Sequence, residues 1–157
     1  METLESVVAA MPLFRGLRPE HVQQIVSCAE TAQYEAGQFL GRVGEPAETF
    51  WIIRQGRVAL EIHSAGRGPL TVQTIANDEV IGWSWLVPPH VLRFDIHALT
   101  ATRALRFDGR RLRELCARDH ELGHLLSERI SQVLVRRLEA MSMQLMDLYG
   151  VQEGEHE

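Results

Sequence analysis

The chain has 157 residues, of which 45% are apolar and 24% are charged, and this size and composition are typical of one globular domain. Its formal net charge of −5 provides no basic surface for nucleic acid, so we expect no direct binding to DNA. Cys28 and Cys116 stand far apart and outside any CxxC pattern, which argues against a disulfide framework and a metal site.

The first thirty residues predict one short helix. Residues 7–14 are apolar but too few to cross a membrane, and Glu2 and Glu5 precede them instead of a basic start. We therefore expect a cytoplasmic protein without a membrane partner. Residues 20–30 carry apolar side chains at helical spacing after Gly16-Leu17-Arg18-Pro19, where the proline suits a first helical turn.

Between residues 34 and 107 the pattern changes to short runs rich in valine, isoleucine, phenylalanine and tryptophan, separated by glycines. Runs such as 50–53, 58–62 and 96–99 are typical of strands in a small roll or barrel. Gly66-Arg67-Gly68-Pro69 predicts the tip of a hairpin. The sequence thus favours a mainly β fold with flanking helices.

From Arg110 onward the strands give way to helical periodicity. Leu112, Leu115 and Cys116 form one helical patch, and residues 122–149 then run without proline, which predicts a long C-terminal helix. The last segment, 151–157, is acidic and lacks periodicity, so we expect it to be a flexible tail after a single domain of residues 1–150.

Two apolar stripes run along the predicted long helix. One has spacings of 4, 3, 4 and 3, which form the a/d seam of a coiled coil and predict a homodimer. Its members are Leu134, Leu138, Met141, Leu145 and Leu148. A second stripe of Leu126, Ile130 and Val133 is expected to pack on the helix's own domain. The alternative is a monomer in which one wide stripe lies on the β fold.

Several motifs in the first sixty residues carry a resemblance to a known family. They are Pro12-Leu13-Phe14 with Gly16-Leu17, then Ala36-Gly37-Gln38, then residues 44–53 and Gly56-Arg57-Val58. In combination they resemble the cyclic nucleotide-binding domain of Crp/Fnr-type regulators over about residues 11–148. The resemblance implies a β-roll, that is a double-stranded jelly roll, followed by a long dimerisation helix.

Regulators of this type continue into a DNA-binding helix-turn-helix domain, whereas nine residues follow Leu148 here. We therefore expect a stand-alone regulatory domain that acts through a protein partner.

The resemblance also implies a phosphate-binding cassette. In the family a Gly-Glu pair opens a short helix and Arg-x-Ala-x-x-x-Ala follows on a strand, where the glutamate holds the ribose hydroxyl and the arginine holds the cyclic phosphate. Here Gly82 keeps the glycine, but Trp83 takes the glutamate position. Alignment on Ala98 puts Leu92 at the arginine position and Phe94 at the first alanine. Both family anchors are therefore displaced.

Arg93 lies one residue out of phase with the family's arginine. Because side chains alternate along a strand, it should point away from the pocket unless a bulge or a shortened loop turns it inward. Turned inward, it can pair with a phosphate or carboxylate, aided by N–H groups of a short helix that begins near Trp83. Trp83, Trp85 and Phe94 either fill the pocket or stack on a flat ligand.

In the family the long helix also reaches the base, and the matching positions here are Met141 and Ser142. The candidate pocket thus comprises Gly82, Trp83, Ser84, Trp85, Arg93, Phe94, Met141 and Ser142. No nucleophile elbow, P-loop or paired carboxylates occur, so we predict no catalytic residue. The first hypothesis is a regulatory sensor for a nucleotide or another small anionic effector. The alternative is a structural adaptor whose pocket is plugged.

Overall fold

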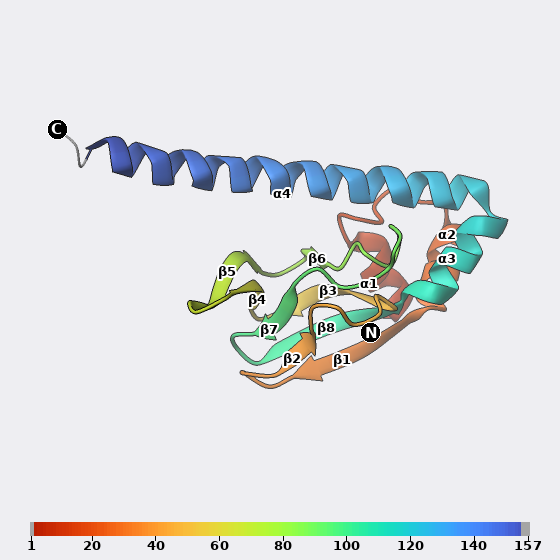
Figure 1. Cartoon of the computed structure of the whole chain (residues 1–157). Helices are drawn as coiled ribbons and strands as arrows, with labels where there is room; N and C mark the ends of the chain where they lie inside the picture. The colour runs from red at the N-terminus through yellow and green to blue at the C-terminus, as the bar shows by residue number, and fades with distance from the viewer. Residues whose placement is uncertain (1, 155–157) are drawn as a thin grey trace.

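The computed structural model describes residues 2–154, and the side chains of residues 2–150 (Figure 1). Within this range the chain forms two four-stranded antiparallel sheets, ordered β1-β8-β3-β6 and β2-β7-β4-β5. The strands are β1 Ala29–Tyr34, β2 Phe39–Gly41, β3 Thr49–Gln55, β4 Val58–Ser64, β5 Gly68–Ile75, β6 Val80–Ile81, β7 Asp95–Ala98 and β8 Thr102–Asp108. The helices are α1 Leu4–Ala10, α2 Pro19–Val26, α3 Gly109–Arg118 and α4 His120–Gly154.

The predicted fold class is confirmed, since the chain is mainly β with flanking helices. Alternation along the central strand β3 explains the layers. Phe50 and Ile52 belong to the core beneath the helices, whereas Trp51 and Ile53 belong to the core of the roll. One sheet therefore serves two hydrophobic cores, and the run 50–53 is apolar throughout because both faces of the strand are buried.

Aromatic stacking joins this sheet to the segment after β6. Phe50 stacks on Phe107 of β8 with ring centroids 4.5 Å apart, and Trp85 stacks on Phe50 at 4.9 Å. All three rings are buried. They thereby fix the turn that contains Trp85 against β3.

The first half of helix α4 anchors it to the domain. Leu122, Leu126 and Ile130 are buried in the core beneath the helices. At its start, Oδ1 of Asp119 accepts a hydrogen bond from the Leu122 N–H at 3.1 Å, and Oδ2 lies 3.1 Å from Nε2 of the buried His21. In Figure 1 the second half of α4 continues past α1–α3 over the β4–β5 hairpin.

Two predicted helix boundaries differ from the structure. The helix expected over residues 20–30 ends at Val26, because Ala29 pairs with Phe107 in the β1–β8 ladder, so tertiary pairing overrides the local spacing. The long helix expected over 122–149 runs from His120 to Gly154. Four residues of the predicted flexible tail are therefore helical, and residues 155–157 lie outside the described residues. Within the described part of the chain, no helix is long and apolar enough to cross a membrane.

A polar cluster on the outer face of the second sheet holds the β2–β3 connection. Oδ1 of the buried Asp95 accepts a hydrogen bond from the Val43 N–H at 2.8 Å, and Oδ2 lies 2.7 Å from Nε2 of His63. Burial by itself raises the pKa of Asp95, but the Val43 hydrogen bond and the charges of Arg42 and His63 outweigh it and lower the pKa. The charged form of Asp95 is therefore favoured by folding.

Replacing Asp95 with Asn should lower the free energy of unfolding near neutral pH. Because the folded-state pKa is lowered, this stabilisation is present above the unfolded-state pKa of about 3.9 and is lost as the pH falls through the folded-state pKa. The difference between wild type and variant should therefore shrink below about pH 4. Urea titrations across this range measure it, with the exposed Asp147→Asn as control. An equal difference at all pH values would contradict the assignment.

Gly109→Ala should destabilise the fold by about 1–3 kcal/mol through overpacking. An added Cβ would lie 2.7 Å from Cβ of Trp85 and 3.2 Å from the Glu48 carbonyl oxygen. Gly150→Ala is the matched control, because it also lies in a helix and has no neighbour within 4 Å. Urea unfolding of both variants measures the effect, and equal stabilities would show that the Trp85 contact is not tight.

Candidate functional site

The candidate site is a small cavity inside the roll, closed on one side by the segment between β6 and β7. Five of the predicted pocket residues line it: Gly82, Trp83, Ser84, Arg93 and Phe94. Leu60, Ile81, Leu92 and Ile96 complete its apolar wall, and α4 contributes Arg137. The cavity has a volume of about 20 Å³, which is close to the space of a single water molecule.

The segment 82–94 has no helix, contrary to the prediction of a short helix near Trp83. Gly82 has a φ of +90°, and the chain then makes one turn in which the Leu86 N–H donates to the Trp83 carbonyl at 3.0 Å. Pro88 and Pro89 follow at once, and neither can donate a backbone hydrogen bond to extend the turn. A row of helix N–H groups is therefore not available to an anion here.

Trp85 does not line the cavity, although it was placed in the predicted pocket. Its ring is buried in the core beneath the helices, on Phe50. Trp83, two residues earlier, is half-buried at the cavity, and Phe94 packs against the core of the roll. Two of the three aromatic residues thus line the cavity, and the third lies wholly in the core beneath the helices, against which Trp83 also packs.

The helical contribution to the cavity differs from the prediction by one turn. Met141 and Ser142 do not line the cavity, and the Ser142 hydroxyl donates to the Leu138 carbonyl at 2.8 Å. Arg137 lines it instead, four residues before Met141 and thus on the same side of the helix. Sequence reasoning missed Arg137, although its i, i+4 relation to Met141 was the signal that could have found it.

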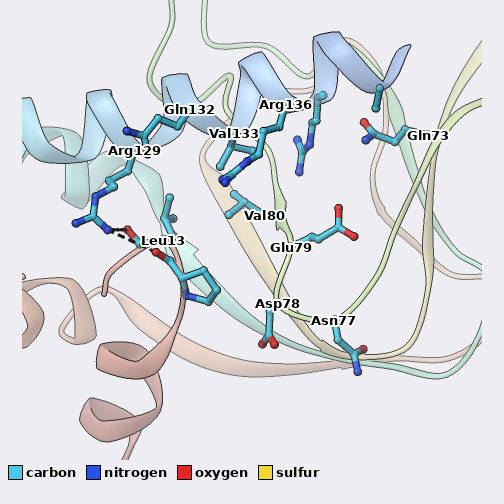
Figure 2. Close-up of a pocket in the computed structure, with 13 residues that line it drawn as sticks. Leu13, Gln73, Asn77, Asp78, Glu79, Val80, Arg129, Gln132, Val133 and Arg136 are labelled. Atoms are coloured by element: carbon cyan, nitrogen blue, oxygen red, sulfur yellow. Dashed lines mark hydrogen bonds between the residues drawn. The ribbon is translucent and has the colours of Figure 1, made fainter. Parts of the chain in front are cut away.

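Arg137 also lines a larger groove, which Figure 2 shows. It has a volume of about 580 Å³ and separates α4 from the β5–β6 turn. Arg136 and Arg137 stand on the helical wall, and Asp78 and Glu79 stand on the turn. Where the groove meets the N-terminal segment, Arg129 donates to the carbonyls of Pro12 and Leu13 at 3.5 and 3.3 Å. Arg129 thereby ties α4 to the N-terminal segment.

The second half of α4 presents apolar side chains to solvent. Of the predicted dimer seam, Leu134 packs against the core beneath the helices and Met141 is half-buried, whereas Leu138, Leu145 and Leu148 are exposed by 56–65%. Val135, Met143, Met146 and Tyr149 are exposed by 54–72%. Leu126, Ile130 and Val133 pack on the chain's own core, as predicted.

The family model described as "Cyclic nucleotide-binding domain" matches residues 31–119, which include both sheets apart from the first two residues of β1, and the cavity apart from Arg137. The chain belongs to the cyclic nucleotide-binding domain family. The resemblance seen in the sequence is therefore confirmed.

The fold of the chain is similar to that of a putative cyclic nucleotide-binding protein from Geobacter metallireducens, with a TM-score of 0.78, 22% identity and coverage of 88% of this chain and 99% of that chain. The fold is also similar to the catabolite activator protein of Thermus thermophilus, with a TM-score of 0.68, 23% identity and coverage of 88% of this chain and 63% of that chain.

Longer relatives match this domain with part of their length. A putative potassium channel protein of Rhodopseudomonas palustris is 27% identical over 145 residues, which are 92% of this chain and 34% of that protein. The acetyltransferase Pat of Mycolicibacterium smegmatis is 36% identical over 75 residues, which are 48% of this chain and 22% of that protein. This chain thus spans about a third of the length of the first relative and less than a quarter of the second.

The two residues that the sequence aligns with the family's anchors are both apolar. Trp83, aligned with the glutamate, is half-buried, and Leu92, aligned with the arginine, belongs to the core of the roll. Arg93 lines the cavity although its side chain is exposed. It therefore stands at the cavity's outer boundary.

We expect cyclic AMP and cyclic GMP to bind no tighter than about 100 μM. The sequence alignment predicts that both anchors are displaced, and each charge-assisted hydrogen bond lost in this way costs about 1.5–3 kcal/mol. Isothermal titration calorimetry measures this, with 5′-AMP as the control ligand. Trp83→Ala removes the ring that fills the ribose side and should not restore binding, because no arginine replaces Leu92. Micromolar binding by the wild type would contradict the assignment.

Proposed function

We propose that residues 1–150 form a non-catalytic regulatory domain that responds to a small effector other than a cyclic nucleotide. The domain pairs as a homodimer through α4 and acts on a protein partner. The observation that carries this proposal is the position of α4. Arg137 reaches the cavity, and the neighbouring Leu138 is exposed in the apolar seam. One rigid helix therefore connects the effector cavity with the dimer surface.

The relatives support a regulatory role. A putative potassium channel protein, an acetyltransferase and the human cGMP-dependent protein kinase 2 share this domain over 34%, 22% and 13% of their lengths. Their names describe three unlike activities, so the shared segment does not account for any one of them. A domain that biases the state of a different output is consistent with all three.

The size of the cavity favours a second candidate function, the structural adaptor. A volume of about 20 Å³ is far below the roughly 300–1,000 Å³ of sites that enclose drug-sized ligands. Trp83 and Phe94 act as the plug in this alternative, and the surface of the roll with α4 binds the partner directly. The two candidates differ in whether any ligand enters the cavity.

The dimer is tested by Leu138→Glu. A carboxylate in an a/d seam is buried without a partner when two helices pair, which should weaken the dimer on the order of a hundredfold or more. Sedimentation equilibrium of wild type and variant measures the association. Met143→Glu is the matched control, because Met143 is equally exposed but lies at the f position, outside the seam. A monomeric wild type, or equal loss in both variants, would overturn the dimer.

A further inference from the structure

The cavity brings together two arginines from distant parts of the chain. Arg93 comes from the segment between β6 and β7, and Arg137 comes from α4. None of the residues that line the cavity carries a carboxylate. The local charge at this point is therefore positive.

Neither arginine has a protein partner among residues 2–150. Each forms no side-chain hydrogen bond within that range, and no carboxylate oxygen lies within 4.0 Å of either guanidinium. Burial lowers the pKa of Arg137, and the charge of Glu79 opposes this effect without outweighing it. A cation that has lost part of its hydration without gaining a partner is costly. An anion between the two guanidiniums would offset that cost.

The remaining lining strengthens such an interaction. The buried Ser84 adds a hydroxyl donor, while Trp83 and Phe94 contribute apolar surface. Burial of Arg137 lowers the dielectric around its guanidinium, so attraction to an opposite charge is stronger there than at an exposed surface.

We propose that this cavity binds a small inorganic anion between Arg93 and Arg137. The inference rests on the proposed sensor function and names its effector class. A volume of about 20 Å³ admits a group the size of one water molecule, and the exposed Arg93 lets a larger oxyanion contact the site from outside. The buried cation of this site is Arg137 of α4, whereas the family's cassette uses an arginine on a strand.

The anion would also act on α4 through Glu79. Arg137 lines both the cavity and the groove, and Glu79 stands across the groove. The anion and the Glu79 carboxylate therefore compete for one guanidinium. Occupancy draws Arg137 towards the roll, which changes the seating of the helix that carries the apolar seam.

The test is thermal unfolding in a gluconate buffer of constant ionic strength, in which chloride or inorganic phosphate replaces gluconate. We expect a saturable rise in the unfolding temperature with at least one of the two anions. Arg137→Gln and Arg93→Gln should each raise the half-saturating concentration about tenfold or more. Glu79→Gln should lower it, because the competing charge is removed while an oxygen remains to accept from the Ala76 N–H.

Arg136→Gln is the matched control, because Arg136 is the adjacent arginine and lines only the groove. It should retain the wild-type response. The proposal is overturned if neither anion gives a saturable rise, or if the rise is unchanged in Arg137→Gln. Equal loss in Arg136→Gln identifies an adventitious ion only and also overturns it. If Arg137→Gln fails to fold, the half-saturating anion concentration of Arg93→Gln is compared with that of the wild type instead, because Arg93 is exposed and its replacement should leave the fold intact.

Sedimentation of the wild type in the same buffers separates this inference from the proposed function. A dimer without a saturable anion response overturns the anion site and leaves the dimeric domain intact. A monomer that still responds to the anion overturns the dimeric function and leaves the anion site standing.

Discussion

Phe50 stacks on both Phe107 and Trp85. The remaining architecture depends on this buried aromatic contact, because the sheet, the segment after β6 and the helices meet there. Phe107 is the last but one residue of β8, Trp85 fixes the turn after Gly82, and Gly109 lets α3 begin directly against Trp85. Aromatic rings contribute large buried areas and prefer a limited set of geometries, so the stack orients the turn as well as burying it. Trp83 is thereby held on the cavity side while Trp85 remains in the core.

The same core determines how α4 lies on the roll. Three residues of α4 itself, Leu122, Leu126 and Ile130, are buried in this core, and Asp119 caps the first turn of the helix. Because an α-helix is stiff over this length, anchoring the first half aims the second half along the roll. Arg137 falls at the point where the helix passes the cavity, and Leu138, Leu145 and Leu148 beyond it are exposed.

The central segments were predictable because their physical signals are local. The apolar run at residues 50–53 and the glycines at 66 and 68, which both have positive φ, correspond to β3 and the β4–β5 hairpin. The cassette was harder, because its residues were assigned to the cavity by register alone. Trp83, Arg93 and Phe94 do line the cavity, but register could not distinguish Trp85 from Trp83, since the packing of Trp85 on Phe50 decides which ring faces the cavity.

By itself the sequence determined the β-roll and the helical C-terminus with its apolar stripes. These features depend on residue type and spacing, which act over a few residues. Only the tertiary structure decided that the cavity is nearly filled and that Arg137, not Met141 or Ser142, reaches it from α4. The reason is that the packing of the buried face sets where a long helix lies on a sheet. A shift of the helix by one turn leaves the periodic pattern of the sequence unchanged, so the sequence does not show which turn faces the cavity.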